Sequence, residues 1–364
     1  MTRIAVLPGE GIGPEIVAQA RKVFEALRHF GFEAEWVEGA VGGVAYEMHG
    51  DPLPAETLAL ARGADAVLFG TVGDPRFDHL DRALRPERAI LGLRRALGLY
   101  ANLKHVAVPK ALASLSPLRE ERVAGLDLLV VRELDGDVYT GQPRGRRAAP
   151  DGPFAGQREG FDTMRYAEGE VRRVARIAFE AARARRGGLA SVDKANVLET
   201  SGLWRAVVRE MAADYPDVTL THLYADNALM QLISQPTRFD VLVTGNLFGD
   251  LLSDAASVLT GSIALAASAL LGDRPCGMYE AGHGSALDIA GQDRANPIAC
   301  IRAAALMLRH SLGRADLAAR VEDAVSAVLV SGLRTADMAQ APGTRCVGTA
   351  HMGNAIVAAL HAGG

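Results

Sequence analysis

The sequence predicts a largely parallel α/β fold in two domains, and three observations support that prediction. Short apolar runs typical of strands alternate along most of the chain with longer runs whose apolar residues recur at helical spacing. Several of the short runs are continuously apolar, which is expected of strands covered by helices on both faces. The length of 364 residues is enough for two domains with substantial cores.

The individual elements can be taken in chain order. The predicted strands include RIAVL (3–7), ADAVLFG (64–70), LDLLVVREL (126–134), LASVDKA (189–195) and FDVLVTGN (239–246). The predicted helices include GPEIVAQARKVFEALRHF (13–30), EVRRVARIAFEAARARR (170–186), CIRAAALMLRHSL (300–312) and ADLAARVEDAVSAVLVSG (315–332). This alternation of strand and helix is typical of a parallel sheet.

One segment departs from the alternation. In VVRELDGDVYTGQPRG (130–145), the pair Asp135-Gly136 lies between two β-prone runs and predicts a hairpin turn. The Gly- and Pro-rich polar stretch RGRRAAPDGPFAGQREG (144–160) follows, and we expect it to form an arm or a loop.

Composition argues against several classes of protein. The formal net charge is −4 and the 39 basic residues are spread along the chain, which argues against nucleic acid as the main partner. The 3 cysteines are too few and too scattered for a disulfide framework or a zinc site. A secretory signal and a long apolar span are both absent from the sequence, so we expect a cytoplasmic protein without a membrane partner.

The stretch AVLPGEGIGPEI (5–16) resembles a nucleotide-binding loop at first sight. A Rossmann fingerprint needs the spacing G-x-G-x-x-G, but here the third glycine comes one residue early and Pro14 stands in its place. A P-loop is excluded as well, because Gly-Lys-Ser/Thr is missing. The simpler interpretation is a strand-to-helix turn in which the glycines satisfy backbone geometry.

Two carboxylates follow the apolar strand within FDVLVTGNLFGDLLSD (239–254). Asp250 and Asp254 are four residues apart, so they share one face of a helix. They could simply favour the helix dipole, or they could bind a hard divalent cation such as Mg²⁺. Asp226 could supply a third carboxylate.

Cationic groups form a second set of candidates, made of Arg94, Lys104 and Arg132. Arg132 ends a strand, and a buried charge needs a partner, either the neighbouring Glu133 or the carboxylate of a ligand. Tyr139 and Lys194 could carry protons, although each alone is more often a packed or solvated side chain. In addition, YEAGHGSALDIAGQDRANP (279–297) is rich in small residues, which let a ligand approach the backbone.

Taken together, these segments closely resemble the β-decarboxylating dehydrogenases of the isocitrate/isopropylmalate dehydrogenase family, and its isopropylmalate branch most of all. The matching blocks follow in order along nearly the whole chain: VLPGEGIGPEI, GTVGDPRFD, RPERAILGLRR, ANLK, VVREL, SVDKANVLE, TGNLFGDLLSD and HGSALDIAGQDRANP. The resemblance implies a two-domain fold with a largely parallel sheet and a hairpin arm, distinct from a Rossmann fold. It also implies a cofactor-side domain (1–99 plus 262–364) holding both termini, and a second domain (100–261) with the dimer interface, an arm (about 133–160) and the metal site.

The resemblance also implies an activity, the NAD-dependent oxidative decarboxylation of a 3-alkyl-substituted malate. 3-Isopropylmalate, an intermediate of leucine biosynthesis, is the favoured substrate and 4-methyl-2-oxopentanoate the product. By position, the implied ligands of the malate carboxylates are Arg94, Lys104 and Arg132, and those of Mg²⁺ or Mn²⁺ are Asp226, Asp250 and Asp254. Lys194 with Asp226 would take the hydroxyl proton, and Tyr139 would protonate the enol. A homodimer with shared active sites is implied, in which Lys194, Val197 and Asp226 come from the partner.

The implied cofactor is NAD. Asp288 matches the family residue that binds the adenosine ribose, and a carboxylate there repels the 2′-phosphate of NADP, while Ile289 follows where NADP-using relatives have Tyr. The full set of implied cofactor residues is Ile12, Asn196, His283, Gly284, Ser285, Ala286, Asp288, Ile289 and Asn296.

The resemblance also implies the substituent of the substrate, through a mostly apolar pocket. Glu87, Ile90, Leu91 and Val197 match the residues that accept the isopropyl group. Several positions depart from the family pattern, namely Lys104 in place of Arg, Asp74 in place of Gly, Ala281-Gly282 before His283, and Leu287 in place of Pro. These departures leave open a different 3-substituted malate, tartrate or homoisocitrate. A non-catalytic regulatory paralogue is the alternative of another class, and the retained acid–base groups and aspartates disfavour it.

Overall fold

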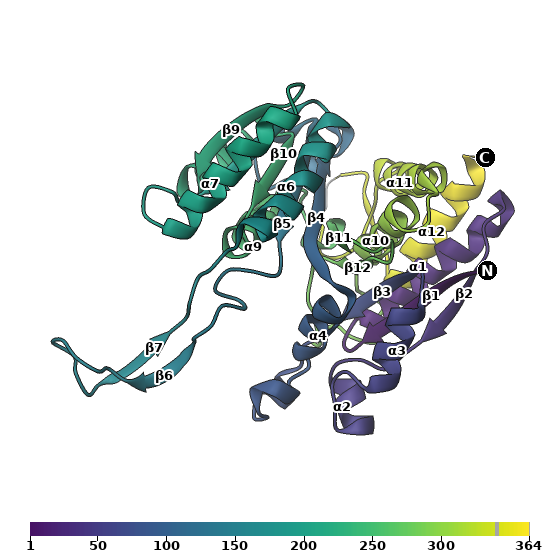
Figure 1. The fold of residues 1–364 in the computed structure, drawn as a ribbon. Coiled ribbons are helices and arrows are strands. Elements are labelled where there is room, and N and C mark those ends of the chain that lie inside the picture. Colours follow the sequence, from purple (N-terminus) through teal and green to yellow (C-terminus); the bar gives the residue numbers. More distant parts are fainter. Residues whose placement is uncertain (339–341, 364) are drawn as a thin grey trace. The chain divides into compact units, whose positions relative to one another are not determined.

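The computed structural model describes residues 1–338 and 342–363, which divide into two compact units. The first unit comprises Met1–Asp127 and Ala256–Gly364, and the second Leu128–Ala255. The division predicted from the sequence places residues 100–127 and 256–261 in the second domain instead. The difference arises because β4 (Leu99–Val108) pairs antiparallel with β11 (Ala267–Gly272) and so belongs to the first unit (Figure 1).

The strands of the first unit follow the order β2-β1-β3-β12-β11-β4. The first four are parallel, whereas β11 runs antiparallel to both of its neighbours. Their remaining bounds are β1 (Thr2–Gly9), β2 (Ala34–Glu38), β3 (Ala66–Thr71) and β12 (Met278–Ala281). Every residue of β3 is buried, as predicted for a strand covered on both faces. The short strands β13 (Leu333–Arg334) and β14 (Arg345–Cys346) form a separate parallel pair.

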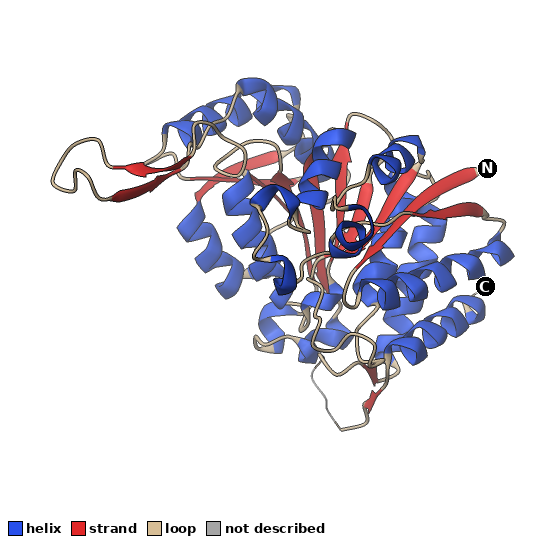
Figure 2. Ribbon diagram, turned by 90° about the horizontal axis from the view of Figure 1, so that it is seen from below, coloured by secondary structure: helices blue, strands red, loops and turns tan. Residues whose placement is uncertain are grey.

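Four long helices of the first unit pack against one another (Figures 1 and 2). They are α1 (Gly13–Ala26), α10 (Ile298–His310), α11 (Ala315–Val330) and α12 (Thr349–Ala362). The other helices of this unit are α2 (Gly43–His49), α3 (Ala55–Gly63), α4 (Arg88–Leu97) and α5 (Glu120–Val123). Short 3₁₀ turns lie at η1 (Leu27–Phe30), η2 (Pro75–Phe77), η3 (Arg82–Leu84), η4 (Lys110–Leu115) and η7 (Ile263–Leu265).

The second unit is built on a parallel sheet in the order β5-β10-β8-β9. Its strands are β5 (Leu126–Glu133), β8 (Gly188–Asp193), β9 (Thr219–Tyr224) and β10 (Val241–Thr244). Its helices are α6 (Glu168–Arg183), α7 (Glu199–Met211), α8 (Ala225–Ser234) and α9 (Asn246–Val258), with 3₁₀ turns η5 (Ala212–Asp214) and η6 (Pro236–Arg238). α6 and α7 pack together, and Phe179 and Trp204 are buried in the core. All the strands and helices predicted above are found.

A two-stranded arm projects from the second unit (Figures 1 and 2). Its strands β6 (Gly145–Ala148) and β7 (Arg158–Phe161) pair antiparallel, with Gly145 opposite Phe161. The hairpin predicted at Asp135-Gly136 is wrong. There the buried Glu133 carboxylate accepts the backbone N–H groups of Asp135 and Gly136, both at 2.8 Å, and closes a tight turn at the end of β5.

The glycines of the first turn allow close backbone approach, as the simpler interpretation predicts. A Cβ on Gly9 would lie 1.9 Å from Thr71 O, and one on Gly13 2.1 Å from Pro8 O. A Cβ on Gly11 would lie 2.0 Å from Ser285 O, in the loop that follows β12. These contacts admit no side chain, and they bring the 282–291 loop against the start of α1.

In the part of the chain that the structure describes, every helix is too short or too polar to cross a membrane.

Candidate active site

The centre of the candidate site in the second unit is Arg132, the buried penultimate residue of β5. Its Nε and Nη2 donate to Asn246 Oδ1 at 3.0 and 2.7 Å, and its Nη1 forms a short ion pair with Asp250. The partner of Arg132 is therefore Asp250 on α9, and the sequence neighbour Glu133 instead lies 3.7 Å from Arg173. Arg132 is held flat against α9 because Gly249 has no Cβ, which would lie 2.6 Å from Arg132 Cγ.

Tyr139 joins the same cluster from the segment after β5. Its hydroxyl donates to Asp250 Oδ2 at 2.7 Å, and the Arg132 guanidinium lies 5.5 Å from the centre of its ring. Burial, and then the Asp250 carboxylate, raise the pKa of Tyr139 above its ordinary value of 10. The phenol therefore keeps its proton at neutral pH, as a proton donor must.

The two carboxylates of α9 lie beyond the first turn of the helix. α9 begins at Asn246, so Asp250 and Asp254 occupy its second and third turns, where the helix dipole has little effect. The dipole interpretation is thereby weakened. Asp254 is exposed, and Asp250 is half-buried between Arg132 and Tyr139. Two carboxylates on one helical face are suitable ligands for a hard divalent cation.

Lys194 and Asp226 form a second, more open pair in the same unit. Lys194 follows β8 directly and Asp226 lies in the first turn of α8, with Lys194 Nζ 2.7 Å from Asp226 Oδ1. The Asp226 side chain is 64% exposed, and the hydrogen bond from Lys194 lowers its pKa. Among the described residues, no group of three or more His, Cys, Asp or Glu side chains is placed to hold a metal. Within one chain, Asp226 is therefore not grouped with Asp250 and Asp254.

Arg94 and Lys104 lie in the first unit, on α4 and β4. Arg94 Nη2 is 3.4 Å from Glu280 Oε1 of β12. Lys104 is buried and pairs across the sheet with Ser268 of β11. Positions 87, 90, 91 and 94 follow helical spacing from the N-cap of α4 onward. Arg94 therefore lies on the same face as the predicted pocket residues Glu87, Ile90 and Leu91. Glu87 and Leu91 are exposed on that face, and Ile90 is half-buried.

The predicted cofactor loop is anchored to the first glycine turn. Ile12 is buried and its N–H donates to Ser285 O at 2.9 Å, while Ser285 Oγ donates to Gly73 O and Gly291 N donates to Glu15. Ala286 adopts a positive φ of 40°, which shows how tightly the loop turns. Asp288 is exposed, and Gly284 and Ile289 line the same loop.

His283 and Asn296 are fixed in different ways. Burial lowers the pKa of His283, its Nδ1 lies 3.1 Å from Gly284 O, and its Nε2 is buried without a hydrogen-bond partner in the described residues. Asn296 is buried, with Oδ1 accepting from Ile298 N at the start of α10 and Nδ2 donating to Asp337 Oδ2, each at 3.0 Å. In the second unit, Asn196 and Val197 are exposed in the turn after β8.

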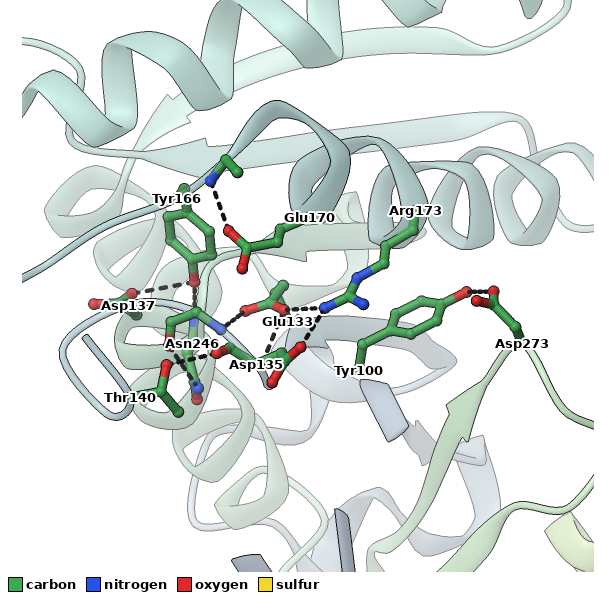
Figure 3. Close-up of polar contacts among 12 residues, drawn as sticks. Tyr100, Glu133, Asp135, Asp137, Thr140, Tyr166, Glu170, Arg173, Asn246 and Asp273 are labelled. Carbon is green, nitrogen blue, oxygen red and sulfur yellow. Dashed lines mark hydrogen bonds and ion pairs between the residues drawn. The ribbon is translucent and has the colours of Figure 1, made fainter. Parts of the chain in front are cut away.

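Sequence reasoning missed the residues that support these groups. Asn246 binds Arg132, and Asp337 binds Asn296, Ser262 and Thr335. Asn246 alone carried a signal, because it stands where the apolar strand meets a helix. The buried Asp137 and the half-buried Tyr166, which contact the start of α9 (Figure 3), gave none.

Comparison with known proteins defines the class. Residues 3–356 match the family described as isocitrate/isopropylmalate dehydrogenase, and the chain belongs to that family. Solved structures with a similar fold include an isocitrate dehydrogenase from Methylococcus capsulatus (TM-score 0.85, 37% identity, 99% of each chain covered). A β-decarboxylating dehydrogenase from Thermococcus kodakarensis is also similar (TM-score 0.79, 32% identity, 100% of this chain and 97% of that one). The predicted fold class is confirmed.

Relatives within the family are more specific. A protein of Burkholderia pseudomallei (strain 1710b) named 3-isopropylmalate dehydrogenase is 61% identical over 358 residues, covering 98% of this chain and 100% of the relative. Proteins of the same name from Burkholderia thailandensis and Bordetella avium are 60% and 58% identical, each over 98% of this chain and over 100% and 99% of their own lengths.

Proposed function

We propose that this protein catalyses the NAD-dependent oxidative decarboxylation of (2R,3S)-3-isopropylmalate to 4-methyl-2-oxopentanoate, as in leucine biosynthesis. The observation that carries the proposal is the Arg132–Asp250–Tyr139 cluster, in a chain 61% identical to a 3-isopropylmalate dehydrogenase. In this cluster Arg132 is a cation that can bind a substrate carboxylate, Asp250 is a carboxylate that can bind a metal, and Tyr139 is a protonated phenol. These are the groups that oxidative decarboxylation of a hydroxy diacid needs.

Each side chain has a proposed task. Arg132 binds a substrate carboxylate through its guanidinium fork, which makes paired hydrogen bonds to planar anions. Lys194, held by Asp226, takes the proton of the 2-hydroxyl, and Tyr139 returns a proton to the enol carbon after CO₂ has left. From the first unit, we propose Arg94 and Lys104 as further ligands of the substrate carboxylates. Glu87, Ile90, Leu91 and Val197 are proposed to surround the isopropyl group.

The residues present fit a divalent cation, because Asp250 and Asp254 offer two carboxylates on one helical face. We propose that they hold Mg²⁺ or Mn²⁺ together with Asp226 of a second copy of the chain. When bound, the cation supplies Lewis-acid polarisation of the substrate oxygen.

The residues present also fit NAD, because His283 Nε2 is a buried polar atom that lacks a partner among the described residues. We propose that NAD, which accepts the hydride from C2, binds along the 283–289 loop with its ribose at Asp288. Ile12, Asn196 and Asn296 are proposed to complete that site.

We further propose a cytoplasmic homodimer with shared active sites. Large apolar side chains are exposed on two helices of the second unit, Met230 (61% exposed) on α8 and Leu251 (60%) on α9. The exposed Asp226, which is not grouped with Asp250 and Asp254 within one chain, gives a second reason for a partner.

The test is NAD reduction by the purified protein with Mg²⁺ or Mn²⁺, with 3-isopropylmalate, isocitrate, homoisocitrate, tartrate and malate offered separately. Rapid turnover of 3-isopropylmalate alone is expected. Preference for another 3-substituted malate would favour the second candidate function, in which that malate is the natural substrate. The buried Lys104 supports this candidate, because an ammonium binds a carboxylate as a point charge where a guanidinium would bind it as a fork.

A further inference from the structure

Asp137 has an unusual position in the segment between β5 and the arm. Its backbone adopts φ 73°, in the left-handed region, and its side chain is almost fully buried. A non-glycine residue persists in such a conformation only where its surroundings enforce it, and a buried carboxylate needs hydrogen-bond donors. The contacts of Asp137 therefore offset both the strain of its backbone and the burial of its carboxylate.

The Asp137 carboxylate binds the start of α9. Oδ2 accepts from Leu247 N at 3.2 Å and from the Tyr166 hydroxyl at 3.4 Å, while Oδ1 accepts from Val138 N at 2.7 Å. The Tyr166 oxygen in turn accepts from Asn246 N at 2.8 Å (Figure 3). The first two N–H groups of α9 thus end on two side chains from other segments, which satisfy donors that a helix start leaves unpaired.

The backbone of Asp137 is held as firmly as its side chain. Its N–H donates to Arg165 O and its C=O accepts from Gly141 N, both at 3.0 Å. Room for the Tyr166 ring depends on Gly136, whose Cβ would lie 2.3 Å from Tyr166 Cε1. Asp137 therefore connects the segment that carries Tyr139, two residues further on, to the helix that carries Asp250.

The two segments that Asp137 connects both carry residues of the proposed site. Asn246, the first residue of α9, accepts both Arg132 hydrogen bonds through Oδ1 and donates through Nδ2 to Gly136 O at 3.3 Å. One turn further along α9, Asp250 accepts the Tyr139 hydroxyl. A shift of the start of α9 would displace Arg132 and Asp250 together, away from Tyr139.

We propose that Asp137, with Tyr166, is a positioning residue that fixes the start of α9 and so keeps Arg132, Asp250 and Tyr139 in register. The inference rests on the proposed function, which gives those three groups their tasks. Neither Asp137 nor Tyr166 has to touch substrate, cofactor or metal for this role.

The variants are chosen to separate the carboxylate from the backbone. Asp137→Gly adopts the left-handed backbone without strain and removes both acceptors. Asp137→Asn also tolerates that backbone, but replaces one acceptor with a donor. Tyr166→Phe removes the acceptor of Asn246 N and the hydroxyl that donates to Asp137, but keeps the bond from Leu247 N to Asp137. Asp214→Asn, at an exposed aspartate of η5 in the same unit, is the matched control.

Two readouts are needed, steady-state kinetics and hydrogen exchange of the segment 246–254. For the three variants we expect kcat to fall about tenfold to a hundredfold with a raised KM for 3-isopropylmalate, since small displacements at a reacting centre are costly. The KM for NAD should stay within about twofold. Amides 246–250 should exchange at least about tenfold faster, because the loss of the acceptor of Asn246 N or Leu247 N loosens the first turn of α9. Asp214→Asn should match the wild type in both readouts.

Unchanged kinetics in Asp137→Gly would overturn the proposal. The proposal would also be overturned if the KM values for 3-isopropylmalate and NAD rose equally and amide hydrogen exchange became faster across the whole second unit. That result is expected if Asp137 only stabilises the fold. A wild type that fails to oxidise 3-isopropylmalate, while the variants still exchange faster at 246–250, would refute the proposed function and leave the fixing of α9 intact. An active wild type with unchanged exchange in the variants would refute the positioning role alone.

Discussion

Two ion pairs in the second unit, Arg132–Asp250 and Lys194–Asp226, have similar chemistry but very different surroundings. In each, a basic residue at the end of a parallel strand meets a carboxylate on a helix. Arg132 is buried and donates to both Asn246 and Asp250, whereas Asp226 is 64% exposed and accepts a hydrogen bond from Lys194. Neighbouring side chains of the same chain fix the position of Arg132, whereas the exposed Asp226 can contact another molecule.

This difference suggests which pair depends on assembly. The buried Arg132 side chain, bonded to two residues of α9, has a geometry that is fixed by folding. An exposed pair gains little stability from its attraction and is kept for other reasons, such as a role in a shared site. Substitutions in each pair test that contrast.

Replacing Lys194 should abolish catalysis. Lys194→Ala removes the proposed base, and a positioned acid–base group contributes about a hundredfold to ten-thousandfold to rate. Turnover of 3-isopropylmalate should be lost while circular dichroism and sedimentation match the wild type. Lys110→Ala, at an exposed lysine of the first unit, is the control. Full activity in Lys194→Ala would refute the assigned role.

Replacing Tyr139 tests the buried cluster in the same way. Tyr139→Phe keeps the ring against Arg132 but removes the proton donor, so kcat should fall about a hundredfold. Tyr46→Phe, at a partly exposed tyrosine packed on Phe77, should be silent. Normal kcat in Tyr139→Phe would exclude it as the acid.

Lys104→Arg should have a modest effect. If Lys104 already suits 3-isopropylmalate, restoring a guanidinium should raise kcat/KM by no more than about twofold, although the two cations are not equivalent at a bidentate site. Parallel assays with each 3-substituted malate measure this. A large gain on 3-isopropylmalate would instead indicate that the natural substrate is a different one.

The pH dependence of stability tests a buried acid that lies outside both pairs. Burial raises the pKa of Glu133 from 4.5 to about 7, so the folded protein binds this proton more tightly than the unfolded chain. The contribution of Glu133 to the free energy of unfolding should therefore fall as the pH rises from about 4.5 to about 7, and level off above that. Urea unfolding of wild type and Glu133→Gln across this range measures it. Identical pH slopes would contradict the assigned pKa.

The sequence predicted the parts of the fold and site that depend on local pattern. Asp250 and Asp254 are four residues apart in a segment that follows an apolar strand, so they were predicted to share one helical face, and that helix is α9. The glycine turn was correctly interpreted because its spacing excludes a fingerprint.

Non-local contacts could not be predicted in this way. Asp135-Gly136 has the composition of a hairpin turn, but the buried Glu133 carboxylate binds both N–H groups and directs the chain elsewhere. Glu133 was a reasonable partner for Arg132 by proximity in sequence, yet adjacent residues of a strand point to opposite faces of the sheet. The pairing of β4 with β11 joins segments that are far apart in the chain, so the sequence did not reveal it. For that reason the predicted boundary placed most of β4 in the other domain.

The most direct test of the contrast is subunit complementation. Lys194→Ala and Asp250→Asn are each expected to be inactive, and the two proteins are unfolded together, refolded as a mixture and assayed with 3-isopropylmalate, NAD and Mg²⁺. If sites are shared across a dimer, mixed dimers contain one intact site, and activity should recover to about a quarter of the wild-type value for random pairing. A mixture as inactive as its components, in which mixed dimers are nevertheless detected by mass spectrometry, would contradict the shared site.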